Sequence, residues 1–231
     1  MSTMTPYDPI FSRRGLLAVA SAAGLALASG NAVAAAPSWE DFLAAIKRDS
    51  ADLAATLLNR GFDQNAPSPD GQVALIAAIR EPSPQVVRTL LSTRKTQVDL
   101  KNRAGETPLM MAAIRCELDI ARQLIARDAA VNKTGWAPLH YAVSSATVLP
   151  ERQTDMVKLL LENFAFIDAE SPNGTTPLMM ASFYGREESA YLLLQEGADT
   201  AMRNQQGLTA ADFARKSNRQ ALAKAIEKGK G

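Results

Sequence analysis

The sequence predicts an all-α solenoid in which short pairs of helices stack side by side. One recurring phrase begins with glycine, and its five glycines stand 34, 30, 39 and 33 residues apart: Gly71-Gln-Val-Ala-Leu75, Gly105-Glu-Thr-Pro-Leu109, Gly135-Trp-Ala-Pro-Leu139, Gly174-Thr-Thr-Pro-Leu178 and Gly207-Leu-Thr-Ala-Ala211. A second phrase precedes several of these glycines, as in Leu57-Leu-Asn-Arg-Gly61 and Leu193-Leu-Gln-Glu-Gly197. The chain of 231 residues is 47% hydrophobic but only 6% aromatic, which favours helices packed through small aliphatic side chains. A period of 20 to 50 residues is the sequence signature of a repeat protein, whose units must stack to bury their apolar faces.

Each element of the repeat follows from the residue types in these phrases. The leading glycine can adopt a positive φ and close a turn before the first helix. A threonine then stands where an N-cap hydroxyl satisfies free backbone N–H groups, at Thr107, Thr176 and Thr209. A proline occupies the first helical position, where no N–H is needed, at Pro108, Pro138 and Pro177. The second helix ends near Gly61 or Gly197, where glycine suits a left-handed cap. The unit is therefore helix, tight turn, helix and β-turn.

The motifs resemble those of ankyrin-repeat proteins. The phrases that carry the resemblance are Thr107-Pro108-Leu109, Ala137-Pro138-Leu139-His140-Tyr141-Ala142 and Gly197-Ala198-Asp199, and it extends over about residues 39–231. It implies an ankyrin-repeat solenoid of helix–turn–helix units joined by β-hairpins, and a non-catalytic scaffold for protein–protein interaction. Together with the N-terminal segment described below, the chain is similar to exported ankyrin-repeat proteins of Gram-negative bacteria.

The predicted ankyrin-repeat domain covers residues 35–231. An N-terminal cap runs over about 39–70, four repeats over about 71–104, 105–134, 135–173 and 174–206, and a C-terminal cap over about 207–231. The third repeat carries six additional residues between its two helices, within about 145–153. Caps are expected because a bare terminal repeat would expose apolar surface.

Residues 1–34 are predicted to be a cleavable signal peptide. Arg13-Arg14 precedes the uncharged stretch 15–36, and Ala32-Val33-Ala34 matches a small-residue cleavage site, with cleavage expected after Ala34. The segment Ser12-Arg13-Arg14-Gly15-Leu16-Leu17 resembles the twin-arginine export motif, with the general secretory route as the alternative. We therefore expect a periplasmic protein that meets the membrane only during export. An uncleaved segment would instead tether it to the inner membrane.

The composition argues against several classes of function. With 25 basic and 24 acidic residues the chain lacks the basic excess that nucleic-acid binders carry. One cysteine and one histidine exclude an internal disulfide framework and a Cys/His zinc site. No phosphate-binding loop, catalytic triad or paired-carboxylate signature is evident, so we expect neither an enzyme nor a bound cofactor.

Three features of the sequence permit a chemical interpretation and a structural one. His140 could act as a general base, but the resemblance implies that it hydrogen-bonds between turns. Cys116 could be a redox-sensitive thiol, and its place between two helices suggests partial exposure. The methionine pairs at 110–111 and 179–180 could bind copper through their thioethers or fill gaps in the core. An accessory factor for a cofactor- or metal-containing enzyme is therefore the alternative function.

The expected binding site is the concave face, formed by exposed residues late in each first helix together with the hairpin tips. The predicted partner-binding residues are Arg80, Ile114, Arg115, Trp136, Phe183 and Tyr184. Aromatic and arginine side chains are enriched at the energetic centres of protein interfaces. Phe183 has an alternative role, since it could turn inwards to fill space left by Ser182. The partner is predicted to be another protein.

Overall fold

The structure is a computed structural model that describes residues 36–145 and 150–229. All the regular elements in this part of the chain are α-helices. They are α1 (Trp39–Lys47), α2 (Ala51–Asn59), α3 (Ala74–Arg80), α4 (Pro84–Ser92), α5 (Pro108–Arg115), α6 (Leu118–Ile125), α7 (Pro138–Val143), α8 (Pro150–Glu162), α9 (Pro177–Phe183), α10 (Glu187–Gln195), α11 (Ala210–Lys216) and α12 (Gln220–Lys228). The predicted signal peptide, with Arg13, Arg14 and Ala34, lies outside the described residues. Within them, no helix is long and apolar enough to cross a membrane.

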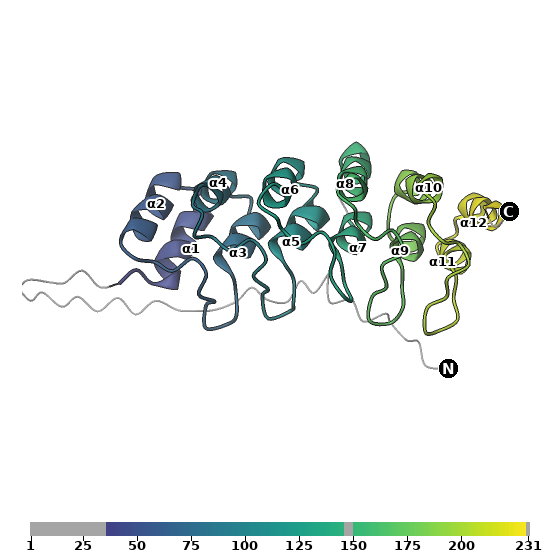
Figure 1. Ribbon diagram of the computed structural model, residues 1–231, viewed down its shortest axis with the longest axis horizontal. Coiled ribbons are helices and arrows are strands. Elements are labelled where there is room, and N and C mark those ends of the chain that lie inside the picture. Colours follow the sequence, from purple (N-terminus) through teal and green to yellow (C-terminus); the bar gives the residue numbers. More distant parts are fainter. Residues whose placement is uncertain (1–35, 146–149, 230–231) are drawn as a thin grey trace, which may run out of the picture. The chain divides into compact units, whose positions relative to one another are not determined.

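Within residues 36–229 the helices form two layers (Figure 1). The odd-numbered helices stack on one another in an inner layer, in the order α1, α3, α5, α7, α9 and α11. The even-numbered helices lie in the outer layer, and each packs against the inner helix that precedes it. The long connections between successive pairs project together to one side of the inner layer (Figure 1). This arrangement confirms the predicted solenoid of helix pairs.

The connections close as tight turns built on glycines with positive φ. In the connection before α5, the N–H of Asn102 donates to the carbonyl of Glu106 at 3.0 Å, and the N–H of Gly105 donates to the carbonyl of Asn102 at 2.8 Å. Ser171, Gly174 and Thr175 repeat the same pair of bonds before α9. These bonds are those of a hairpin turn, although no described residue forms a β-strand. Gly105 and Gly174 have φ of 76° and 75°, the left-handed geometry predicted for them.

The helix ends follow the predicted capping chemistry. The hydroxyls of Thr107, Thr176 and Thr209 accept hydrogen bonds from the backbone N–H of the third residue of α5, α9 and α11. Gly61 and Gly197 have positive φ just after α2 and α10, as expected of left-handed caps. Local sequence chemistry therefore sets where these helices begin and end.

One continuous apolar core runs between the two layers. It is made mostly of alanine, leucine, isoleucine, valine and methionine side chains from every helix pair. Met110, Met111, Met179 and Met180 all lie within it, where they fill the core.

The third repeat differs from its neighbours because part of its additional sequence extends α8. This helix has 13 residues, against 8 in α6 and 9 in α10. The Gln153 side chain, in the first turns of α8, is fully buried, and its amide nitrogen donates to the carbonyls of Val143 and Ser145 at 3.3 and 2.8 Å. Its amide oxygen accepts from the backbone N–H of Arg186 and the Ser189 hydroxyl, each at 3.0 Å. Gln153 therefore ties α7, α8 and the start of α10 together.

Candidate functional site

Arg80 lies at the end of α3 and is held by polar contacts across two repeats. Its guanidinium donates to the Gln72 side-chain oxygen at 3.1 Å and pairs with the Glu106 carboxylate at 3.6 Å. Glu106 also accepts a hydrogen bond from Asn102 at 2.6 Å and one from the Tyr141 hydroxyl at 3.4 Å. Burial and the nearby Glu106 charge raise the pKa of Tyr141, so its hydroxyl remains a donor. Arg80 thus presents a partly exposed, oriented positive charge on the inner layer.

Ile114 and Arg115 occupy the equivalent place at the end of α5. Both are half-buried, and Ile114 packs against the core. The Arg115 Nε is enclosed without a hydrogen-bond partner among the described residues. The structure therefore makes these two residues less available to a partner than the sequence predicts.

Phe183 ends α9 and Tyr184 follows it, and the two residues differ in exposure. The Phe183 ring lies between the Tyr184 ring, with centroids 4.6 Å apart, and the Phe213 ring of α11, with centroids 6.1 Å apart. Phe183 is half-buried in this edge-to-face cluster, whereas Tyr184 is 41% exposed. Ser182 is buried, and its hydroxyl donates to the Leu178 carbonyl within α9. The aromatic contribution to the surface therefore comes mainly from Tyr184, supported from behind by Phe183.

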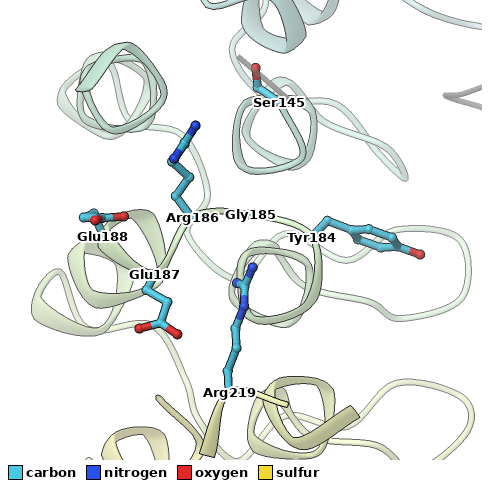
Figure 2. A pocket seen from close by; sticks show the side chains of 7 residues that line it. All are labelled: Ser145, Tyr184, Gly185, Arg186, Glu187, Glu188 and Arg219. Atoms are coloured by element: carbon cyan, nitrogen blue, oxygen red, sulfur yellow. The ribbon is translucent and has the colours of Figure 1, made fainter. Parts of the chain in front are cut away.

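A polar pocket of about 470 Å³ opens beside Tyr184. Its lining consists of Ser145, Tyr184, Gly185, Arg186, Glu187, Glu188 and Arg219. Figure 2 shows Ser145 and Arg186 on one side of the turn at Gly185, with Arg219, just before α12, reaching towards the end of α9. The Arg219 guanidinium donates to the Ala181 carbonyl at 3.1 Å, which fixes its position. Both signs of charge line this pocket, so it suits the polar side chains of a protein segment.

The sequence analysis did not predict this pocket, and Arg219, the residue that the C-terminal cap contributes to it, was not among the candidate site residues. The spacing of three polar residues in the sequence could have indicated it. Gln153, Arg186 and Arg219 are each 33 residues apart, so they occupy the same repeat position just before or inside successive outer helices. Two of the three, Gln153 and Arg219, hydrogen-bond to carbonyls at the end of an inner helix.

Trp136 and His140 lie at the other end of the inner layer, beside the connections. The two rings meet edge to face with centroids 5.4 Å apart, and Trp136 is half-buried. His140 Nδ1 accepts from the Ala137 N–H at 3.1 Å, and its Nε2 lies 3.0 Å from the Thr175 carbonyl. Because a carbonyl can only accept, Nε2 carries the proton. Burial lowers the pKa of His140 to about 4, so the ring is neutral and joins two successive turns, as the resemblance implies.

The predicted site residues thus form two groups. Trp136 precedes an inner helix, and Tyr184 follows the next one, whose seven residues span about 10 Å at 1.5 Å per residue. One partner protein can contact both groups because a typical interface buries about 800 Å² on each side.

The expectation that Cys116 is partly exposed is wrong. Its side chain is buried, and its sulfur donates to the Ser145 hydroxyl at 3.2 Å. Burial also raises the pKa of the thiol. Cys116 has φ of 54° after α5, so it takes the left-handed place that glycine usually fills, and the turn folds its side chain inwards. In the described part of the chain, no three His, Cys, Asp or Glu side chains gather where they could hold a metal.

Comparison with known proteins identifies the class to which this architecture belongs. The family model for ankyrin repeats in three copies matches residues 83–170, 132–204 and 148–230. The chain is 29% identical over 178 residues to mouse ankyrin repeat and SAM domain-containing protein 6, and 31% identical over 166 residues to the chicken nuclear factor NF-kappa-B p105 subunit. These alignments cover 74% and 69% of this chain but only 16% of each relative.

The chain therefore belongs to the ankyrin-repeat family, whose repeats serve as protein-binding modules. A solved structure extends this finding over more of the chain. It is the complex of the predatory endopeptidase Bd0816 from Bdellovibrio bacteriovorus with the immunity protein Bd3460. One of its chains superposes with a TM-score of 0.70 at 27% identity, and the match covers 83% of this chain and 99% of that chain.

Proposed function

We propose that this protein is a non-catalytic periplasmic scaffold that binds one partner protein through the inner layer and the connection tips. The main support for the proposal is that this chain matches almost the whole length of one chain in a two-protein complex. It is supported by Tyr184, an exposed aromatic residue beside a polar pocket. Tyrosine and arginine are the residue types that most often dominate binding energy at interfaces.

The class of partner that we propose is an endopeptidase held inactive by the array. The basis is that the matched complex joins an endopeptidase to an immunity protein. A rigid, repeat-built surface suits this task because it loses little conformational entropy when it binds. The alternative of a cofactor-enzyme accessory factor gains no support, since Cys116 and the paired methionines are buried.

Site-specific crosslinking in the cell tests the binding surface. A photo-crosslinking amino acid replaces Tyr184, Trp136 or the exposed Lys224 of the C-terminal cap. We expect positions 184 and 136 to yield the same covalently joined protein, to be identified by mass spectrometry, and position 224 to yield none. A product from position 224 alone would place the partner on the end of the array and contradict the proposal.

Cell fractionation tests the compartment. Arg13→Lys and Arg14→Lys together should leave the protein in the cytoplasm if it follows the twin-arginine route. Unimpaired export of this double variant would favour the general secretory route. Retention of residues 1–34 on the periplasmic protein, read by mass spectrometry, would favour the membrane tether.

A further inference from the structure

Two phenylalanines beyond the end of α8 form the most exposed aromatic surface among the described residues. Phe164 is 85% exposed and Phe166 is 67% exposed. Both follow the end of α8, whereas the pocket beside Tyr184 lies by the start of α10, which contacts Gln153 near the start of α8. The proposed function gives them no role.

Phe164 also has a backbone conformation that is unfavourable for its residue type. Its φ is 63°, in the left-handed region that large side chains avoid. Gly61, Asp128 and Gly197 have positive φ at the corresponding places after α2, α6 and α10. A phenylalanine at such a place costs backbone strain and gains almost no burial in return, so folding does not account for it. Strain that serves no purpose in the fold indicates a functional residue.

The backbone around the pair is firmly held, so the two rings start from fixed positions. The Asn132 side chain donates to the Phe164 carbonyl at 2.8 Å and accepts from the Phe166 N–H at 2.7 Å. One repeat further along the chain, the equivalent backbone N–H makes the same kind of bond. The backbone N–H of Asp199 donates to the Asp168 carboxylate at 3.0 Å. Asp199 therefore stands one repeat beyond Phe166, at the helix-stacking distance of about 10 Å.

Exposed acidic side chains flank the pair in the neighbouring repeats. Asp128 corresponds to Phe164 in the preceding repeat, Asp199 corresponds to Phe166 in the following one, and Glu196 follows α10; all three are exposed. Glu162 is offset by Lys158, whose Nζ lies 3.9 Å away. The rim of the aromatic surface is therefore negative.

We infer that Phe164 and Phe166 form a second docking surface, and that its occupant is a protein segment carrying apolar side chains between basic ones. The negative rim selects a basic segment by charge complementarity. A second copy of this chain is disfavoured, since it would bring the same acidic rim against itself. The two rings also offer only about 300–500 Å² per copy, against about 800 Å² per partner in a stable interface.

The probe for this surface is a fluorescein-labelled dodecapeptide of alternating leucine and lysine, with a leucine–glutamate peptide of the same length for comparison. Fluorescence anisotropy measures binding to the protein. We expect the lysine peptide to bind and the glutamate peptide not to bind. Phe164→Asn and Phe166→Ser should each weaken binding at least about tenfold, as for aromatic anchors in other interfaces.

The controls separate docking from folding and from the proposed function. Asparagine tolerates the left-handed backbone, as Asn218 does at φ of 64°, so Phe164→Asn should leave the unfolding midpoint in urea unchanged or raise it. Tyr191→Ser removes an exposed aromatic residue of α10, and Tyr184→Ala removes the anchor of the inner layer. Neither should alter binding of the peptide. The result for the inner-layer site and the result for this surface are therefore independent, so either proposal can be refuted without refuting the other.

Three results would overturn the inference. The first is equal binding of the lysine peptide by wild type and Phe164→Asn. The second is a marked fall in the unfolding midpoint of Phe164→Asn, which would make Phe164 a structural residue. The third is a wild-type dimer in sedimentation equilibrium that Phe164→Asn dissociates, which would make a second copy the occupant.

Discussion

His140 makes the stability of this fold depend on pH in a defined direction. The side chain is buried, and its ordinary pKa of 6.5 falls to about 4 because burial disfavours the charged ring. The unfolded chain therefore takes up a proton at a higher pH than the folded chain does. The contribution of the neutral His140 ring to the free energy of unfolding is complete above pH 6.5 and is lost as the pH falls from 6.5 towards 4.

The size of the loss follows from the two pKa values. A difference of one pKa unit corresponds to about 1.4 kcal/mol, so the change from 6.5 to about 4 amounts to about 3 kcal/mol. That is a large part of the total stability of a typical domain, which is about 5–15 kcal/mol.

His140→Gln is the matched variant because glutamine keeps one donor and one acceptor and does not titrate in this range. Urea unfolding of both proteins at pH 7.5, 6, 5 and 4.5 gives the difference in their free energies of unfolding. We expect that difference to be constant above about pH 6.5. Below that pH, the free energy of unfolding of the wild type should fall relative to that of the variant by about 1.4 kcal/mol per pH unit. Carboxylates common to both proteins cancel. A difference that does not change with pH would refute the assignment of a buried, neutral His140.

Three further predictions concern packing and burial. Gln153→Ala should lower the free energy of unfolding by about 2–4 kcal/mol, because it leaves buried donors and acceptors unpaired. Urea unfolding measures this change. As a control, Gln195→Ala at an exposed position should change the free energy of unfolding by less than about 0.5 kcal/mol. Gly185→Ala would place its Cβ 2.5 Å from a backbone oxygen and should cost about 1–3 kcal/mol in the same assay, whereas Gly229→Ala, with no contact under 3.6 Å, should be neutral. The Cys116 thiol should react with a disulfide reagent at least about a hundredfold more slowly in the native protein than in urea, because reaction requires local opening.

The sequence predicts this fold well because its signals are local. Glycine, threonine and proline each act within a few residues, so Gly105, Thr107 and Pro108 together define a turn and a helix start. Because the same phrase recurs about every 33 residues, the helix and turn assignment made for one repeat applies to the others. The paired methionines could also be placed, because equivalent slots in two repeats receive equivalent burial.

The candidate site was predicted only in part because exposure depends on neighbouring repeats. Tyr184 is exposed as expected, but Phe183 is covered by Phe213, which lies 30 residues later in the next inner helix. The inward turn of Cys116 depends on its left-handed backbone, which the residue type does not suggest. Phe164 was overlooked for a similar reason, since its strain becomes visible only once its φ is known.

Binding of the crosslinked partner by purified protein tests the central claim most directly. Isothermal titration calorimetry compares wild type with Tyr184→Ala, Trp136→Ala and, as the matched control, Lys224→Ala. Loss of a central aromatic anchor costs about 2 kcal/mol or more, so we expect the Kd to rise at least about 30-fold for Tyr184→Ala or Trp136→Ala. Lys224→Ala should leave the Kd unchanged. An unchanged Kd for both aromatic variants, together with lost binding for Lys224→Ala, would contradict the account and place the partner on the end of the array.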